Sequence, residues 1–238
     1  MATTTTTTTE PGDGQYRLLA WMSPAFPVGG FSYSHGLEFA VETGAVANRH
    51  DVQAFIVTAL EQGSARNDAI LLCAAWRAAA SQDEGSFIAI AERAVAMRAT
   101  AEFALESANQ GEAFLATVDA AWTELGIGRW RALLEAHGIA AAYPVAVALA
   151  AALAGIKLER ALGSYLQAFI AGLVAAAVKL VPLGQTDGQR VIAALEPHVA
   201  AAAKAGLART LDDMGSAAPL LDIWSARHET QYTRLFRS

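Results

Sequence analysis

The stretch 138–156, GIAAAYPVAVALAAALAGI, and the weakly apolar run that follows it to Val178 decide the fold of this 238-residue chain. The first stretch is uncharged and about long enough to cross a bilayer. Alanine dominates it, Pro144 interrupts it, and Lys157 and Glu159 follow at once. Because bulky apolar side chains are few, we interpret both runs as buried helices at the centre of a soluble bundle rather than as membrane spans.

Helical periodicity extends outward from this centre. After Asp51, which we expect to cap a helix, apolar residues recur at i, i+3, i+4, i+7 and i+8. Further helices are expected to begin near Asn67 and Ser86, and no stretch alternates with period two. The sequence predicts an all-α, single-domain bundle of roughly eight to ten helices over 16–214, preceded by a disordered Thr-rich tail at 1–15.

Composition excludes several classes of function. The net charge of −6 and pI near 5.4 give no basic field, so a nucleic-acid partner is not expected. Cys73 is the single cysteine, which rules out an internal disulfide and favours a reducing, cytoplasmic setting. The five histidines show no i, i+3 or i, i+4 pair, so we predict no tight metal site and no bound cofactor.

Two conspicuous breaks interrupt the helical pattern. The segment 18–44, LLAWMSPAFPVGGFSYSHGLEFAVETG, combines proline with a glycine pair and should turn sharply between helices. In 179–190, KLVPLGQTDGQR, Pro182 should end one helix, and Thr186 with Gln189 matches a capping box for the next. Lys179 interrupts an apolar helix, and it is either a snorkelling or paired structural lysine or part of an interaction surface.

The segment 215–238 ends in two aromatic and basic clusters, which is unusual for a chain end. We expect it to dock, either on its own domain or on a partner protein. An enzyme alternative reads Ser34 as a nucleophile with His228 and an aspartate, in the chain order of α/β-hydrolases. That reading needs a buried strand before the serine, which this helical sequence does not supply.

These blocks, SPAFPVGGFSYSHGLE, KLVPLGQTDGQR and SARHETQYTRLFRS, resemble the urease accessory protein UreF family in order and position. The resemblance implies an all-helical, non-enzymatic nickel-insertion chaperone that forms a homodimer and bridges UreD (UreH in some organisms) and the GTPase UreG. It would regulate nickel delivery to the urease apoprotein, with the metal handled by the complex, and it could modulate the GTPase.

The resemblance also implies site residues. In the C-terminal segment, those expected to contact UreD/UreH are Arg227, His228, Glu229, Tyr232, Arg234, Leu235 and Phe236. Residues expected to form partner surfaces, or the framework that supports them, are Pro27, Gly29, Gly30, Ser32, Tyr33, His35, Gly36, Glu38, Lys179, Gly184, Gln185 and Asp187. No catalytic residue and no metal ligand is expected on this chain.

Overall fold

A computed structural model describes residues 11–238, and over that range the chain is helical with no strand. The predicted all-α class is confirmed. In chain order, the helices are α1 (Pro11–Trp21), α2 (Leu37–Glu42), α3 (Arg49–Glu61), α4 (Ser64–Ala80), α5 (Glu84–Ala96), α6 (Ala101–Ala121), α7 (Ile127–Ala136), α8 (Tyr143–Leu153), α9 (Leu158–Leu180), α10 (Gln185–Ala208) and α11 (Pro219–His228). Three short 3-10 helices join them, η1 (Gly30–Ser32), η2 (Thr123–Leu125) and η3 (Leu211–Asp213).

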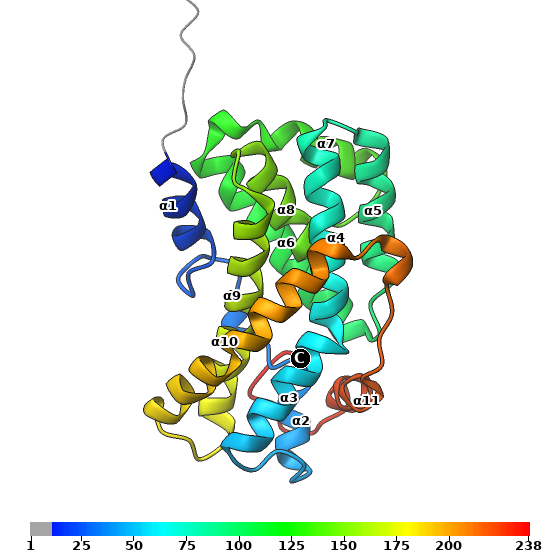
Figure 1. Ribbon diagram of the computed structural model, residues 1–238. Helices are drawn as coiled ribbons and strands as arrows, with labels where there is room; N and C mark the ends of the chain where they lie inside the picture. The colour runs from blue at the N-terminus through cyan, green and yellow to red at the C-terminus, as the bar shows by residue number, and fades with distance from the viewer. Residues whose placement is uncertain (1–10) are drawn as a thin grey trace, which may run out of the picture.

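Helix α8 forms the centre of the bundle, as the sequence predicts. It packs most extensively on α4 and α6 and also contacts α9, and every residue from Pro144 to Ala151 is buried (Figure 1). Alanine allows this close approach, because a helix without bulky side chains can lie nearly in backbone contact with its neighbours. The clearest case is Gly111 on α6, where an added Cβ would lie 1.9 Å from the carbonyl oxygen of Ala141.

The three apolar helices, α8, α9 and α10, differ in whether they are long enough to cross a membrane. Helix α8 has 11 residues, too few to cross a bilayer, which needs about 20. Helices α9 and α10 are long and apolar enough by length and composition alone. Helix α9 places its buried face against α10, α8 and α4, as a core helix of a bundle does.

Helix boundaries differ from the sequence expectations where capping decides them. Asn48, not Asp51, caps α3, since its side chain accepts hydrogen bonds from the backbone N–H groups of His50 and Asp51. The capping box predicted at Thr186 is wrong, because α10 already begins at Gln185 without a side-chain cap. Capping depends on where the chain arrives from, which local sequence does not specify.

The start of the described chain also differs from expectation. Residues 11–15, assigned from the sequence to a disordered tail, belong to α1, and the rest of that tail lies outside the described residues. Proline is well tolerated in a first helical turn, and burial of Leu18 and Trp21 holds the helix against the bundle. Trp21 makes edge-on contacts with Phe114 and Trp122, with ring centroids 6.0 and 5.5 Å apart.

Candidate functional site

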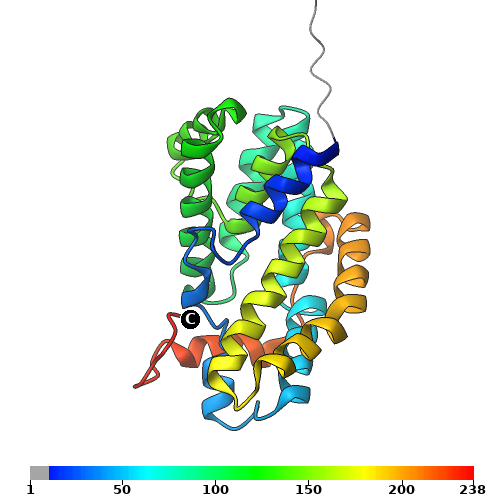
Figure 2. The ribbon, with the colours of Figure 1, turned by 90° about the vertical axis from the view of Figure 1, so that its left-hand side faces the viewer.

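The C-terminal segment, residues 215–238, docks on its own domain. Helix α11 contacts α2 and α6, and Figure 2 shows the end of the chain beside its early part. Trp224 stacks on Phe55 of α3 with ring centroids 5.9 Å apart, and Leu221 is buried. Of the two docking alternatives left open by the sequence, the structure therefore shows the internal one.

His228, the last residue of α11, is the centre of this docking contact. Its ring is fully buried, with 0% of the side chain exposed. Nδ1 lies 2.9 Å from Oε2 of Glu102 on α6, and Nε2 lies 3.0 Å from Oε2 of Glu38 on α2. Each ring nitrogen thus faces a different buried carboxylate.

The two carboxylates also hold the residues that follow α11. Glu38 accepts hydrogen bonds from the backbone N–H of Leu235 at 2.6 Å and of Phe236 at 2.9 Å. Arg234 donates to Oε1 of Glu102 at 3.1 Å. Burial raises the pKa of Glu102, and the hydrogen bond and charge of His228 oppose that shift. We name these four side chains, Glu38, Glu102, His228 and Arg234, the carboxylate–histidine cluster.

The turn at 32–36 receives the end of the docked segment. The backbone N–H of Arg237 donates to the carbonyl of Ser32 at 2.7 Å, and that of Ser34 donates to the carbonyl of Ser238 at 2.5 Å. Gly36 has a φ of +78°, and a Cβ there would lie 2.9 Å from the backbone nitrogen of Ser225 on α11. This glycine is needed both for the left-handed turn and for the close approach of α11.

The hydrolase alternative is wrong. The Ser34 hydroxyl is buried and donates to the carbonyl of Ser238, while both ring nitrogens of His228 face glutamates. No strand precedes the serine in the part of the chain that the structure describes. The elements of a nucleophile elbow are therefore not assembled here.

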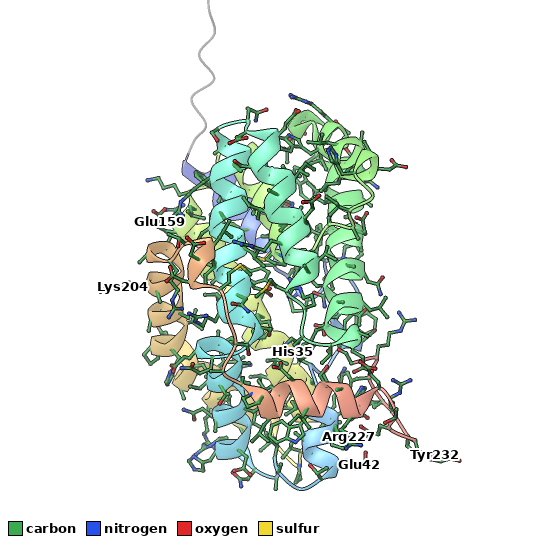
Figure 3. The ribbon with its side chains drawn as sticks, turned by 90° about the vertical axis from the view of Figure 1, so that its right-hand side faces the viewer. His35, Glu42, Glu159, Lys204, Arg227 and Tyr232 are labelled. Atoms are coloured by element: carbon green, nitrogen blue, oxygen red, sulfur yellow. The ribbon has the colours of Figure 1, made fainter. Side chains whose placement is uncertain are left out.

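His35 is a framework residue in this conformation. Its ring stacks on Phe103 with centroids 4.0 Å apart, and Nε2 lies 2.6 Å from the hydroxyl of Ser64. The residue is buried, and its φ of +60° places it in the left-handed region (Figure 3). Phe169 of α9 also meets the ring edge-on, with centroids 5.4 Å apart, and packing on α4, α6 and α9 offsets the cost of that backbone conformation.

The structure divides the sequence-predicted residues of the C-terminal segment into two groups. Arg227, Glu229, Tyr232, Arg234 and Leu235 are exposed, and Figure 3 shows Arg227 and Tyr232 at the outer end of α11. His228 and Phe236 are buried against the domain in this conformation, and their expected contact with UreD/UreH stays a prediction. The reason for their burial is their place in the docking contact, which joins residues about 190 positions apart.

The residues of the two family blocks are likewise not all brought together. Lys179 lies near the docked segment, with its ammonium 5.4 Å from the ring centroid of Phe236, a cation–π contact that favours the structural reading of this lysine. Gly184, Gln185 and Asp187 lie instead at the turn into α10, and Asp187 reaches α3 through Arg49 at 3.8 Å. In the first block, Pro27 is exposed, Gly29, Gly30 and Ser32 are half-buried, and Tyr33 and Gly36 are buried.

Glu102 is the participant that sequence reasoning missed. It lies in the first turn of α6 as an ordinary acidic residue in a helical segment, and only the return of the chain at His228 shows its role.

A cleft of about 280 Å³ lies beside the docked segment, with aromatic walls that include Phe31, Phe103 and Phe236. Between residues 11 and 238, no group of three or more His, Cys, Asp or Glu side chains could hold a metal ion.

The fold and site define a helical protein whose distinctive features are a docked terminal segment and exposed aromatic and basic groups beside it. Comparison with known proteins agrees. The UreF family model matches residues 46–196. The urease accessory protein UreF of Granulibacter bethesdensis is 48% identical over 232 residues, 97% of each chain. The UreF protein of Rhodopseudomonas palustris strain TIE-1 is 46% identical, and the match covers 94% of this chain and 92% of the relative. The UreF protein of Bradyrhizobium diazoefficiens is 47% identical, and the match covers 94% of this chain and 91% of the relative.

The chain therefore belongs to the UreF family of urease accessory proteins.

Proposed function

We propose that this chain is a non-enzymatic urease maturation factor that bridges UreD/UreH and the GTPase UreG in the cytoplasm. It would act as a homodimer and regulate the delivery of nickel, as cargo of the complex, to the urease apoprotein. Family membership supports the maturation role. The observation that carries the bridging role is the exposed aromatic and basic surface on the docked C-terminal segment.

The chemistry of that surface suits a protein interface. Tyr232 is fully exposed, Leu235 is 66% exposed, and Leu220 and Ile223 on α11 are more than half exposed. Monomeric proteins seldom gather so many large apolar side chains on one short segment, and tyrosine and arginine are enriched at the centres of interfaces. We define Leu220, Ile223, Arg227, Tyr232 and Leu235 as the tail surface and assign UreD/UreH as its partner.

Arginine exposure sharpens the idea that this protein modulates UreG. Arg98 is buried and paired with Asp68 at 2.8 Å, so it is not available to a GTPase. Arg190 and Arg234 are exposed but paired, with Asp187 and Glu102 respectively. Arg227 is exposed and has no ion pair among the described residues. Of these four arginines, Arg227 is therefore the one to test first for an arginine-finger role, as an alternative to its place in the UreD/UreH contact.

The first experiment tests maturation. Urease subunits, UreD, UreG and the remaining accessory factors are expressed with nickel in a host, with and without this chain. We expect urease activity to depend on the chain. Equal activity without it, with all components shown to be present, would overturn the proposed function.

The second experiment tests the tail surface. The double variant Arg227→Ala, Tyr232→Ala should bind UreD at least about tenfold more weakly, the usual effect of losing an interface anchor, while its circular dichroism stays helical. The matched control is Tyr16→Ala, Lys204→Ala, which removes an exposed tyrosine from α1 and an exposed cation from α10. Figure 3 shows Lys204 well away from α11. Equal affinity in both double variants would remove the assignment of UreD/UreH to this surface.

A third experiment separates binding from GTPase modulation. UreG turnover is measured with saturating Arg227→Ala, so that weakened binding is compensated by concentration. Reduced turnover at saturation would support a direct role for the guanidinium. Full turnover at saturation would retire that role and leave the bridging proposal intact.

A further inference from the structure

We propose that the carboxylate–histidine cluster is a proton-dependent latch that holds residues 229–238 on the domain and releases them as the pH rises. The inference concerns the chain alone and does not depend on which partner the tail surface binds. It rests on the placement of one fully buried imidazole between two buried carboxylates, from α2 and α6, that also hold the backbone of the segment.

The hydrogen-bond inventory of the cluster requires one more proton than a neutral imidazole carries. Glu38 accepts from two backbone N–H groups as well as from Nε2 of His228, an arrangement that fits an ionised carboxylate. A neutral imidazole that donates to Glu38 from Nε2 has only a lone pair at Nδ1, which faces Glu102 at 2.9 Å. Either imidazolium or a protonated Glu102 supplies the missing hydrogen, and both hold the same extra proton.

The balance of charges around the cluster also indicates one extra proton. The two carboxylates are compensated by the extra proton shared between His228 and Glu102 and by Arg234, which donates to Glu102 at 3.1 Å. The other charged group that faces the cluster is Glu229, at the end of α11, and its charge adds to the negative side. When the extra proton leaves, two acids and a lone pair share a buried space with one cation, and that arrangement is costly unless the segment moves away.

The sign of the pH dependence follows from linkage. The docked state holds a proton that the released state loses once the pH exceeds the range where exposed histidine titrates, about pH 6.5. Above that pH, each further unit should weaken docking by up to about tenfold. Below it, the docked and released states bind the same number of protons, and docking no longer depends on this group.

Hydrogen–deuterium exchange of the full chain tests the latch. Exchange is followed by mass spectrometry from pH 6 to pH 8.5, with each rate corrected for the intrinsic effect of pH. The reporting amides are those of Leu235, Phe236 and Arg237, which are hydrogen-bonded only when the segment is docked. We expect their protection to fall as the pH rises, while peptides of α8 keep theirs.

Three variants identify the group responsible. Glu102→Gln places an amide that can donate to a neutral Nδ1, so the segment should stay protected throughout with little pH dependence. His228→Gln cannot take up a proton, so protection should be low and flat. The matched control is His198→Gln, which removes a half-exposed histidine that faces Glu61 at 2.8 Å on the surface, and it should follow the wild-type profile.

Two results would overturn the latch. The first is wild-type protection of the reporting amides that does not change between pH 6 and pH 8.5, a measurement that stands even if a cluster variant fails to fold. The second is a Glu102→Gln or His228→Gln profile with the same pH dependence as wild type and His198→Gln. A wild-type decline that both cluster variants abolish establishes it.

Discussion

Helix α8 and the C-terminal segment are both attached to parts of the chain far away in sequence, and they are attached by opposite means. Helix α8 is buried through apolar contacts, with no charged side chain along its length. Residues 228–238 are held by hydrogen bonds and charges centred on Glu38 and Glu102. Apolar burial is non-directional and insensitive to pH, whereas the second contact needs particular atoms in particular protonation states. The comparison separates a permanent centre from a conditional attachment.

The largest effect should come from closing the space between α6 and α8. In Gly111→Ala, the new methyl would lie 1.9 Å from the carbonyl oxygen of Ala141 and 2.9 Å from its carbon, both backbone atoms that cannot rotate away. We expect a loss of about 3 kcal/mol or more in the free energy of unfolding, measured by urea denaturation.

The control for that change is Gly163→Ala on α9, where nothing lies within 4 Å of the added methyl. It should be neutral or stabilise by up to about 1 kcal/mol, because alanine is the better helix former. Similar destabilisation by both variants would mean that the close contact of α6 and α8 is not the reason why position 111 requires glycine.

A matched pair of leucines measures the two regions directly. Leu149 of α8 and Leu221 of α11 are both buried, at 0% and 5% exposure. Leu149→Ala should lower the free energy of global unfolding by about 2–5 kcal/mol. Leu221→Ala should cost less than half as much globally, because the segment can open locally without the bundle unfolding. Urea denaturation measures the free energy of global unfolding, and the rate of limited proteolysis after α10 measures local opening of the C-terminal segment. Equal losses of global stability in the two variants would show that both regions unfold as one unit.

The titration of Cys73 on α4 gives a measure of the stability of the apolar core around α8. Burial raises the pKa of this thiol from 9.0 to about 11. The folded state therefore favours the neutral thiol, so its contribution to stability is complete below about pH 9 and is lost as the pH rises toward 11, by about 1.4 kcal/mol per unit. Urea denaturation between pH 8 and pH 11 should show a decline that Cys73→Ala reduces.

The same thiol distinguishes release of the segment from unfolding. At pH 8.5, a thiol reagent should leave Cys73 unmodified in the wild-type chain even where residues 229–238 exchange freely, since the thiol is fully buried in the core. Rapid modification under those conditions would show that release of the segment also opens the centre.

The smallest effect should come from the surface. Arg190→Ala removes an ion pair with Asp187, 2.9 Å long, in which the arginine side chain is 62% exposed. Exposed pairs one helical turn apart contribute a few tenths of a kcal/mol, so the free energy of unfolding should change by less than about 0.5 kcal/mol. A larger loss would indicate that the turn into α10 carries more of the fold than its exposure suggests.

Sequence reasoning succeeded where one local pattern determines the outcome. The alanine-rich run at 138–156 and the helical spacing after residue 51 were sufficient for the all-α class and for a central α8. It failed at Thr186, where a matching capping motif lies inside a helix, because capping depends on how the preceding chain enters. Local pattern predicts the kind of element better than its first residue.

The docking contact was only partly predictable. The aromatic and basic composition of 215–238 indicated that this segment docks, but it gave no way to choose between the domain and a partner. Glu38 was named through a family resemblance, whereas Glu102 was not named, because an acidic residue in a helix carries no local mark of a distant partner. Pairing over more than a hundred residues is a property of the fold, and one sequence without aligned relatives does not display it.

The contact between the turn at 32–36 and residues 237–238 also bears on the synthesis of the protein. Ribosomes make the chain from its N-terminus, so Glu38 and Glu102 are completed long before His228 exists to meet them. Until the C-terminal segment docks, Glu38 and Glu102 lack their hydrogen bonds to His228 and to the backbone of Leu235 and Phe236. Docking of residues 237–238 on the turn at 32–36 closes a loop of about 200 residues, and contacts over such long separations form slowly.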